Sequence, residues 1–222
     1  MRQDGTVVDA VIFDLDGVLV DSEPVWEGVR RRYVKEHGGQ WQPDSQRRLM
    51  GMSTMEWAGY LHDELGTAGP PERIAAAVIE EMAQAYQQRV PLVDGAAQVV
   101  RRLAGRWPLG LASSSPARLI DAALAAAGLT DAFRLTLSTE EVPRGKPAPD
   151  VYLTVAERLG VPAARCVAVE DSTNGVRSAA AAGMRVVAVP HASYPLEPDA
   201  QQLAALILPH ITDLTEESVR PA

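Results

Sequence analysis

The apolar residues of this chain follow a strand pattern at first and a helical pattern soon afterwards. Residues 7–13 form a short, β-branched apolar run that stops at Asp14, which predicts a buried strand followed by a turn. Between residues 25 and 89 the apolar positions recur at helical spacing, and Ser53 and Pro71 are typical of helix N-termini. We therefore expect three helices, at residues 25–36, 54–65 and 71–89.

From residue 93 onward, short apolar strands alternate with helices. Three of these helices are expected to stop at Gly128, Gly160 and Gly183, because glycine readily adopts the left-handed conformation that closes many helices. The alternation predicts parallel strands with right-handed crossovers, hence an α/β fold with a three-layer, doubly wound, Rossmann-like sheet. The strands are expected at residues 109–112, 135–137, 166–169 and 186–189, and the helices at 96–104, 116–127, 150–159 and 174–182.

The first strand lies far in sequence from any strand that could pair with it. Because only the strands after residue 93 can supply its neighbours, we expect a discontinuous catalytic core made of residues 1–20 and 93–222. The helical segment of residues 21–92 is then expected to be an all-helical cap inserted into that core.

Composition narrows the class of protein. Of the 222 residues, 46% are hydrophobic and 23% are charged, which is typical of a soluble globular chain. No apolar run approaches the roughly 18 residues of a membrane span, so we expect a cytoplasmic protein without a membrane partner. The formal net charge of −8 and the lack of a Lys or Arg cluster argue against nucleic acid as a partner. No protein partner is implied, and the single cysteine, Cys166, lies in an apolar run typical of a core.

Ligands of open parallel sheets bind beyond the carboxyl ends of the strands, so residues at those ends are candidates for chemistry. The first strand ends in Asp14 and Asp16, which share one side of an extended chain and can face one pocket. Taken alone, the two acids are also compatible with a solvated turn.

The ends of the next strands carry hydroxyls and a lysine. Ser113 and Ser114 come before Pro116, so free backbone N–H groups at a helix start could bind a phosphate there. The alternative is a serine N-cap without a ligand. Lys146 lies between Gly145 and Pro147, and the two prolines that follow it are expected to hold the chain extended and to place the ammonium as a positive charge.

The strand at residues 166–169 is followed by Glu170 and Asp171. These two acids, together with Asp14, would offer the hard oxygen ligands that suit Mg²⁺, although an aspartate before a helix is also a common N-cap. Each signal is modest by itself. Their joint position at one edge of one predicted sheet favours a site for a phosphorylated small molecule.

The chain resembles the haloacid dehalogenase-like superfamily in the order of four motifs. These motifs are Asp14-x-Asp16-Gly17, a strand that ends in serines, Lys146-Pro147 and Glu170-Asp171. The resemblance implies a Rossmann-like core, a mobile cap and a Mg²⁺-dependent attack by an aspartate on a phosphoryl group. It also assigns expected roles to the motif residues: catalysis to Asp14 and Asp16; phosphate binding to Ser113, Ser114 and Lys146; metal binding to Asp14, Asp16, Glu170 and Asp171.

Within this superfamily the segments DSEPVW (residues 21–26) and LASSSP (111–116) are similar to the group of β-phosphoglucomutase and 2-deoxyglucose-6-phosphatase-type sugar phosphatases. Two departures disfavour a mutase: Trp26 stands where mutases carry histidine, and Thr54 where they carry arginine after the Gly-x-Ser of the cap. The resemblance therefore implies a phosphatase of small phosphorylated metabolites, with sugar or polyol phosphates as the expected substrates. A phosphomutase and a non-catalytic binding module on the same fold are the alternatives.

Three residues of the expected cap are candidates for substrate contact, namely Glu23, Trp26 and Thr54, with residues 51–54 as the segment that carries the last one. For Trp26, packing between cap and core is an equally good interpretation. The four histidines, at positions 37, 62, 191 and 210, show no metal-binding spacing and are expected to be structural or exposed.

Overall fold

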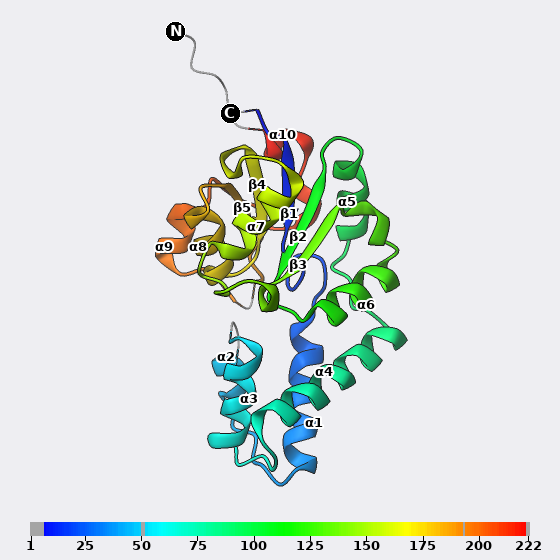
Figure 1. Cartoon of the computed structure of the whole chain (residues 1–222), viewed down its shortest axis with the longest axis vertical. Coiled ribbons are helices and arrows are strands. Elements are labelled where there is room, and N and C mark those ends of the chain that lie inside the picture. Colours follow the sequence, from blue (N-terminus) through cyan, green and yellow to red (C-terminus); the bar gives the residue numbers. More distant parts are fainter. Residues whose placement is uncertain (1–6, 50–51, 193, 221–222) are drawn as a thin grey trace.

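The computed structural model describes residues 7–49, 52–192 and 194–220. Within these ranges the chain forms a six-stranded parallel sheet in the order β3-β2-β1-β4-β5-β6, with helices on both faces (Figure 1). This arrangement confirms the predicted three-layer, doubly wound α/β fold. The strands are β1 (Ala10–Phe13), β2 (Leu109–Ser113), β3 (Leu135–Ser138), β4 (Cys166–Glu170), β5 (Arg185–Ala188) and β6 (Leu206–Ile207).

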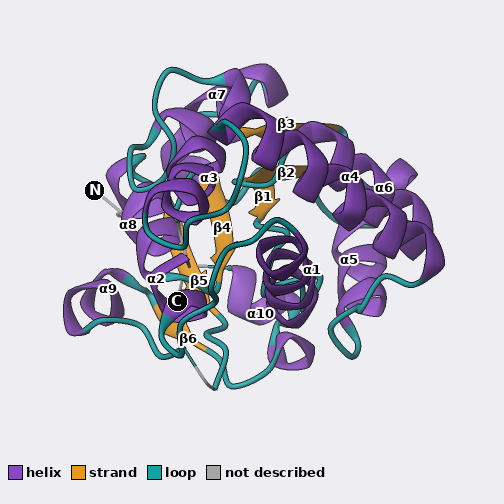
Figure 2. Ribbon diagram, turned by 90° about the horizontal axis from the view of Figure 1, so that it is seen from below, coloured by secondary structure: helices purple, strands orange, loops and turns teal. Residues whose placement is uncertain are grey.

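Both faces of β1 are buried, which explains its unbroken apolar sequence. Side chains alternate along a strand, so Val11 and Phe13 join one hydrophobic cluster while Ala10 and Ile12 join the other. Figure 2 shows α5, α6 and α10 on one side of the sheet and α7, α8 and α9 on the other. The bounds are α5 (Ala96–Ala104), α6 (Ala117–Ala127), α7 (Asp150–Leu159), α8 (Thr173–Ala181), α9 (Pro198–Leu203) and α10 (Glu216–Val219).

Four further helices, here called the cap helices, lie apart from the sheet in Figure 1. The chain leaves β1 and returns from these helices along adjacent paths, since Val20 pairs with Leu92 in an antiparallel bridge and Val93 N donates to Leu19 O at 3.0 Å. This adjacency is compatible with an inserted unit, and the boundaries at residues 20/21 and 92/93 stay a prediction. The cap helices are α1 (Glu23–Glu36), α2 (Ser45–Leu49), α3 (Thr54–Asp63) and α4 (Pro71–Gln88).

The main differences from the expected elements concern short segments. The pattern did not predict α2, α9, β6 or α10, because elements of two to six residues are too short to show a hydrophobic period. β1 begins at Ala10, three residues later than expected, and Val7 is 61% exposed. The segment around Lys146 is a turn, with Ala148 N donating to Gly145 O at 2.9 Å, and the prediction of an extended chain there was wrong. None of the described helices has the length and apolarity needed to cross a membrane.

We predict that Ile12→Ala will lower the free energy of unfolding by about 2–5 kcal/mol, because the substitution leaves a cavity in the middle of the sheet. Ile12 is fully buried on the central strand β1. Leu153→Ala is the control, since Leu153 is 43% exposed on α7 and should change stability by less than about 0.5 kcal/mol. Urea denaturation of the two variants measures the difference, and equal effects would contradict this description of the core.

Candidate active site

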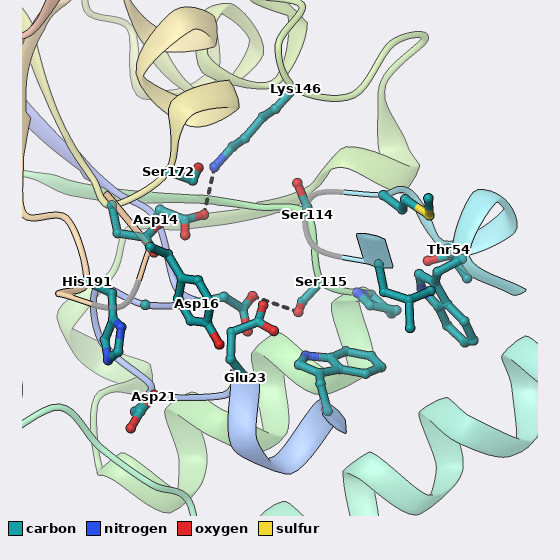
Figure 3. Close-up of a pocket in the computed structure, with 18 of the residues that line it drawn as sticks. Asp14, Asp16, Asp21, Glu23, Thr54, Ser114, Ser115, Lys146, Ser172 and His191 are labelled. Atoms are coloured by element: carbon teal, nitrogen blue, oxygen red, sulfur yellow. Dashed lines mark hydrogen bonds and ion pairs between the residues drawn. The ribbon is translucent and has the colours of Figure 1, made fainter. Parts of the chain in front are cut away.

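The carboxyl ends of the central strands bring separate segments of the chain to one pocket. Asp14 directly follows β1, and its backbone N–H donates to Val169 O on β4 at 2.9 Å, so the parallel pairing extends into the site. Asp16, Lys146 and Asp171 line the same pocket as Asp14. Figure 3 shows Asp14, Asp16 and Lys146 there. The structure therefore brings together residues that lie up to 157 positions apart in sequence, as the strand-end argument predicted.

Gly17 allows the loops after β1 and β4 to approach each other closely. Its φ is +78°, and a Cβ at this position would lie 1.9 Å from Oδ2 of Asp171. Ser172, rather than Asp171, is the N-cap of α8 and accepts a hydrogen bond from Gly175 N. The carboxylate of Asp171 is therefore not engaged as a cap and faces the pocket.

Lys146 is the centre of a buried charge cluster. Its Nζ donates to Oδ1 of Asp14 at 2.7 Å, to Oε1 of Glu170 at 2.6 Å and to the carbonyl of Ala112 at 3.0 Å. Burial favours the neutral amine, but the carboxylates of Asp14 and Glu170 outweigh it and raise the pKa of Lys146. Because all three N–H donors are engaged, Lys146 offers positive charge to a ligand rather than a spare hydrogen bond.

Three acids lie close together beside this single ammonium. Asp14, Glu170 and Asp171 each place a carboxylate oxygen within 4.8 Å of the others. Burial is the main cause that raises the pKa of Asp14 to about 8 and the pKa of Asp171 well above its usual range, and the neighbouring carboxylates add to it. A divalent cation would relieve this repulsion, and carboxylate oxygens are the ligands that Mg²⁺ prefers. The donor set therefore fits a divalent metal.

Glu170 is held more tightly than the other two acids. Its Oε1 accepts from Lys146 and from the Tyr152 hydroxyl at 2.8 Å, and its Oε2 accepts from Asp171 N at 3.0 Å and from Ser172 Oγ at 3.1 Å. A carboxylate with this many hydrogen bonds holds the neighbouring groups of the site in position. Sequence reasoning missed Tyr152, because an aromatic residue on the buried face of α7 reads as ordinary core.

Asp16 is positioned by serine hydroxyls. Ser22 donates to its Oδ1 at 2.6 Å, while Ser115 and Ser113 donate to its Oδ2 at 2.7 and 3.2 Å. Ser113 is fully buried and lies behind Asp16, whereas Ser114 is exposed on the pocket wall. The roles of Ser22 and Ser115 were not predicted, although both lie in the segments that carried the family resemblance.

The cap helices supply the opposite wall of the pocket. Glu23, Trp26 and Thr54 all line it, and Figure 3 shows Glu23 beside Asp16 and Ser115. The Thr54 hydroxyl donates to Glu140 of the sheet region at 3.0 Å. Met50 and Gly51 lie outside the described residues, so the expected contact segment 51–54 is described only from residue 52.

Several further lining residues were missed by the sequence interpretation, among them Arg30, Trp57 and His191. Arg30 and Trp57 belong to helical patterns that predict only a helix, with no mark of a pocket. His191 was expected to be structural or exposed; it is exposed, as expected, and it also lines the pocket. The signal for His191 was available, because it lies three residues after the carboxyl end of β5, at the edge of the sheet where ligands bind.

Comparisons with known proteins show the family of the chain. A family model described as haloacid dehalogenase-like hydrolase matches residues 8–183. The chain is 33% identical to hexitol phosphatase B of Escherichia coli (strain K12), with 95% of this chain and 96% of that protein covered. It is also 33% identical to the phosphorylated carbohydrates phosphatase of Thermotoga maritima, with 83% and 86% covered. The crystal structure of CbbY from Rhodobacter sphaeroides in complex with phosphate is similar at a TM-score of 0.85 and 25% identity, with 96% and 99% covered.

We predict that ionisation of Asp14 makes the stability of the protein depend on pH. With chelator present, raising the pH from 5 to 8 should lower the melting temperature of the unsubstituted protein more than that of the Asp14→Asn variant. Folding raises the pKa of Asp14 to about 8, so the folded protein holds a proton that the unfolded chain releases near pH 4. The contribution of Asp14 to stability is therefore full below about pH 4 and is lost as the pH approaches 8. Thermal unfolding of both proteins at several pH values measures the gap.

Added Mg²⁺ should restore the stability of the unsubstituted protein more at pH 8 than at pH 5, because a metal ion competes with the proton on Asp14. The Asp14→Asn variant should gain less from Mg²⁺ at either pH. If Mg²⁺ changed the melting temperatures of the two proteins equally at every pH, the metal assignment would be contradicted.

Proposed function

The chain belongs to the haloacid dehalogenase-like hydrolase family and is a phosphoric monoester hydrolase, and from this premise we propose that it hydrolyses small phosphorylated carbohydrates through a phospho-aspartyl intermediate. The observation that carries the proposal is the buried contact of Lys146 with Asp14, 2.7 Å long, at the rim of the pocket. The relatives named above are phosphatases of hexitols and of phosphorylated carbohydrates, which supports sugar or polyol phosphates as the substrate class.

Asp14 is the proposed nucleophile. Among the described residues, the hydrogen bond to its carboxylate comes from Lys146 and ends on Oδ1, which leaves Oδ2 for attack on phosphorus. The new bond joins Asp14 to phosphorus, while the bond from phosphorus to the leaving oxygen breaks. The charge of Lys146 beside Oδ1 reduces the repulsion between the attacking carboxylate and the phosphate.

Asp16 is the proposed acid and base. It gives a proton to the leaving alkoxide in the first step and takes a proton from the attacking water in the second, which breaks the bond between Asp14 and phosphorus. Water and the phosphoryl group together leave as inorganic phosphate. Ser22 and Ser115 hold the carboxylate of Asp16 beside the pocket, so its position is set before substrate binds.

Phosphatases of this family generally use a divalent metal, and we propose Mg²⁺. Asp14 and Asp171 would hold it together with the backbone carbonyl of Asp16, and Glu170 would support them through its hydrogen bonds. When bound, the ion supplies positive charge that stabilises the phosphoryl oxygens in the transition state.

Ser114 is proposed to contact the phosphoryl oxygens. It is exposed on the pocket wall just before α6, where backbone N–H groups at the helix start also favour an anion. Ser113 contributes by fixing Asp16 rather than by touching phosphate, since its hydroxyl is buried behind that residue. The proposal therefore keeps the predicted phosphate site at Ser114 and changes the predicted role of Ser113 from phosphate binding to positioning of Asp16.

A phosphomutase is the second candidate activity. It would need groups that return the phosphoryl group to the sugar, and mutases of this family carry histidine and arginine where this chain has Trp26 and Thr54. Both residues line the pocket here, so the departures fall on its wall. Hydrolysis is therefore the favoured outcome.

We predict that Asp14→Asn will lower phosphate release from a hexitol phosphate and from an aryl phosphate by at least about 10⁴-fold, because an amide is a poor nucleophile. Release of inorganic phosphate with Mg²⁺, and its loss in chelator, is the measurement. Asp9→Asn is the matched control, since Asp9 pairs with Arg165 away from the pocket and should keep full activity.

Retention of substantial turnover by a correctly folded Asp14→Asn variant would disprove the nucleophile assignment. Circular dichroism and a cooperative melting curve establish folding. Accumulation of an isomerised sugar phosphate in place of free phosphate would favour the mutase alternative.

A further inference from the structure

Arg30 is a buried cation on the wall of the pocket. Its side chain projects from α1, and the residue is 5% exposed. The guanidinium carbon lies 4.4 Å from the ring centre of Trp26 and 5.0 Å from that of Trp57. Its Nε is buried without a hydrogen-bond partner among the described residues.

Stacking between two indoles explains why the guanidinium stays in one place, but it does not satisfy the N–H groups at the edge of the guanidinium plane. An unpartnered buried donor is costly, and more so when it carries charge. Arg30 remains a cation at neutral pH, because burial lowers its pKa only to about 10. A bound ligand with oxygen acceptors would remove the cost.

Glu23 lies on the same helix about two turns before Arg30 and lines the same pocket. Its Oε2 accepts a hydrogen bond from the side chain of Gln46. Burial raises the pKa of Glu23, and the charge of Arg30 opposes this rise. The pocket wall therefore offers a donor and an acceptor of opposite charge beside two indole rings.

We propose that Arg30 and Glu23 bind hydroxyl groups of a neutral, polyhydroxylated leaving group, with Arg30 donating and Glu23 accepting. A hydroxyl group can both accept and donate, so it suits such a pair, whereas a carboxylate or a second phosphate can only accept. This inference rests on the proposed function, and it names the residues that select among phosphorylated carbohydrates.

The charge of the pocket also disfavours a second anionic group. Lys146 is already engaged by three acceptors, which leaves Arg30 as the other lysine or arginine among the described lining residues. The acids that line the pocket outnumber the two cations. These acids are Asp14, Asp16, Asp21, Glu23 and Asp171.

A matched pair of substrates tests the charge preference on the unsubstituted protein. Sorbitol 6-phosphate and 6-phosphogluconate share a linear six-carbon chain and differ by a terminal hydroxymethyl group against a carboxylate. We expect kcat/KM to be at least about tenfold higher for sorbitol 6-phosphate, and Glu23→Gln to narrow the difference, because it removes a like charge. Equal values, or a preference for 6-phosphogluconate or for a sugar bisphosphate, would overturn the inference.

Substitution of Arg30 tests its hydrogen bonds. We expect Arg30→Met to lower kcat/KM for sorbitol 6-phosphate by about 10- to 100-fold, the effect of losing hydrogen bonds from a charged group. The loss for acetyl phosphate, whose leaving group is short and has no hydroxyls, should be much smaller. Arg30→Lys should give an intermediate loss, because an ammonium lacks the planar fork of donors. Arg31→Gln is the control, since Arg31 is an exposed arginine on the same helix and should leave both rates unchanged.

The inference is supported if Arg30→Met and Arg30→Lys lower the ratio of kcat/KM for sorbitol 6-phosphate to kcat/KM for acetyl phosphate. An equal fall for both substrates would assign Arg30 to packing of the cap helices and would overturn the inference. Thermal unfolding identifies a variant that does not fold. In that case the comparison of sorbitol 6-phosphate with 6-phosphogluconate, made on the unsubstituted protein, tests the inference. If the unsubstituted protein releases phosphate from sorbitol 6-phosphate and from 6-phosphogluconate with equal kcat/KM, the inference fails and the proposed function stands. Failure with every substrate disproves both.

Discussion

The balance of charge around one buried ammonium controls the site. Nζ of Lys146 contacts two buried carboxylates and a carbonyl, and removal of such a partner from a buried pair typically costs about 3–5 kcal/mol. The balance is incomplete, because Asp171 adds a further negative charge next to Asp14 and Glu170. Burial, together with this excess of negative charge, raises the pKa of Asp14, and the same excess of negative charge fits a divalent cation.

A parallel sheet allows this arrangement to be built from distant segments. β1 lies between β2 and β4, so the residues that follow these three strands meet at one edge. Gly17 removes the side chain that would otherwise keep Asp171 away from the turn after β1. The hydrogen bonds of Glu170 and the serine contacts of Asp16 then hold each acid in its own position.

The sheet region and the cap helices contribute different properties to the pocket. The sheet region carries the groups that suit phosphoryl transfer, a step that is the same for many substrates. The cap helices carry Arg30 and Glu23, a pair of opposite charge held by two tryptophans and Gln46. On the roles proposed above, the catalytic groups and the groups that select the leaving group lie on different elements.

The sequence alone determined the α/β class, the parallel sheet and the gathering of Asp14, Asp16, Lys146 and Asp171, because strand patterns are local and parallel strands place their carboxyl ends at one edge. It could not reveal the short elements α2 and β6, which lack a period. It also could not separate Ser113 from Ser114, or identify Arg30 as a pocket residue. Those distinctions depend on which side chains are buried against which neighbours, and only the packing of distant helices against the sheet decides that.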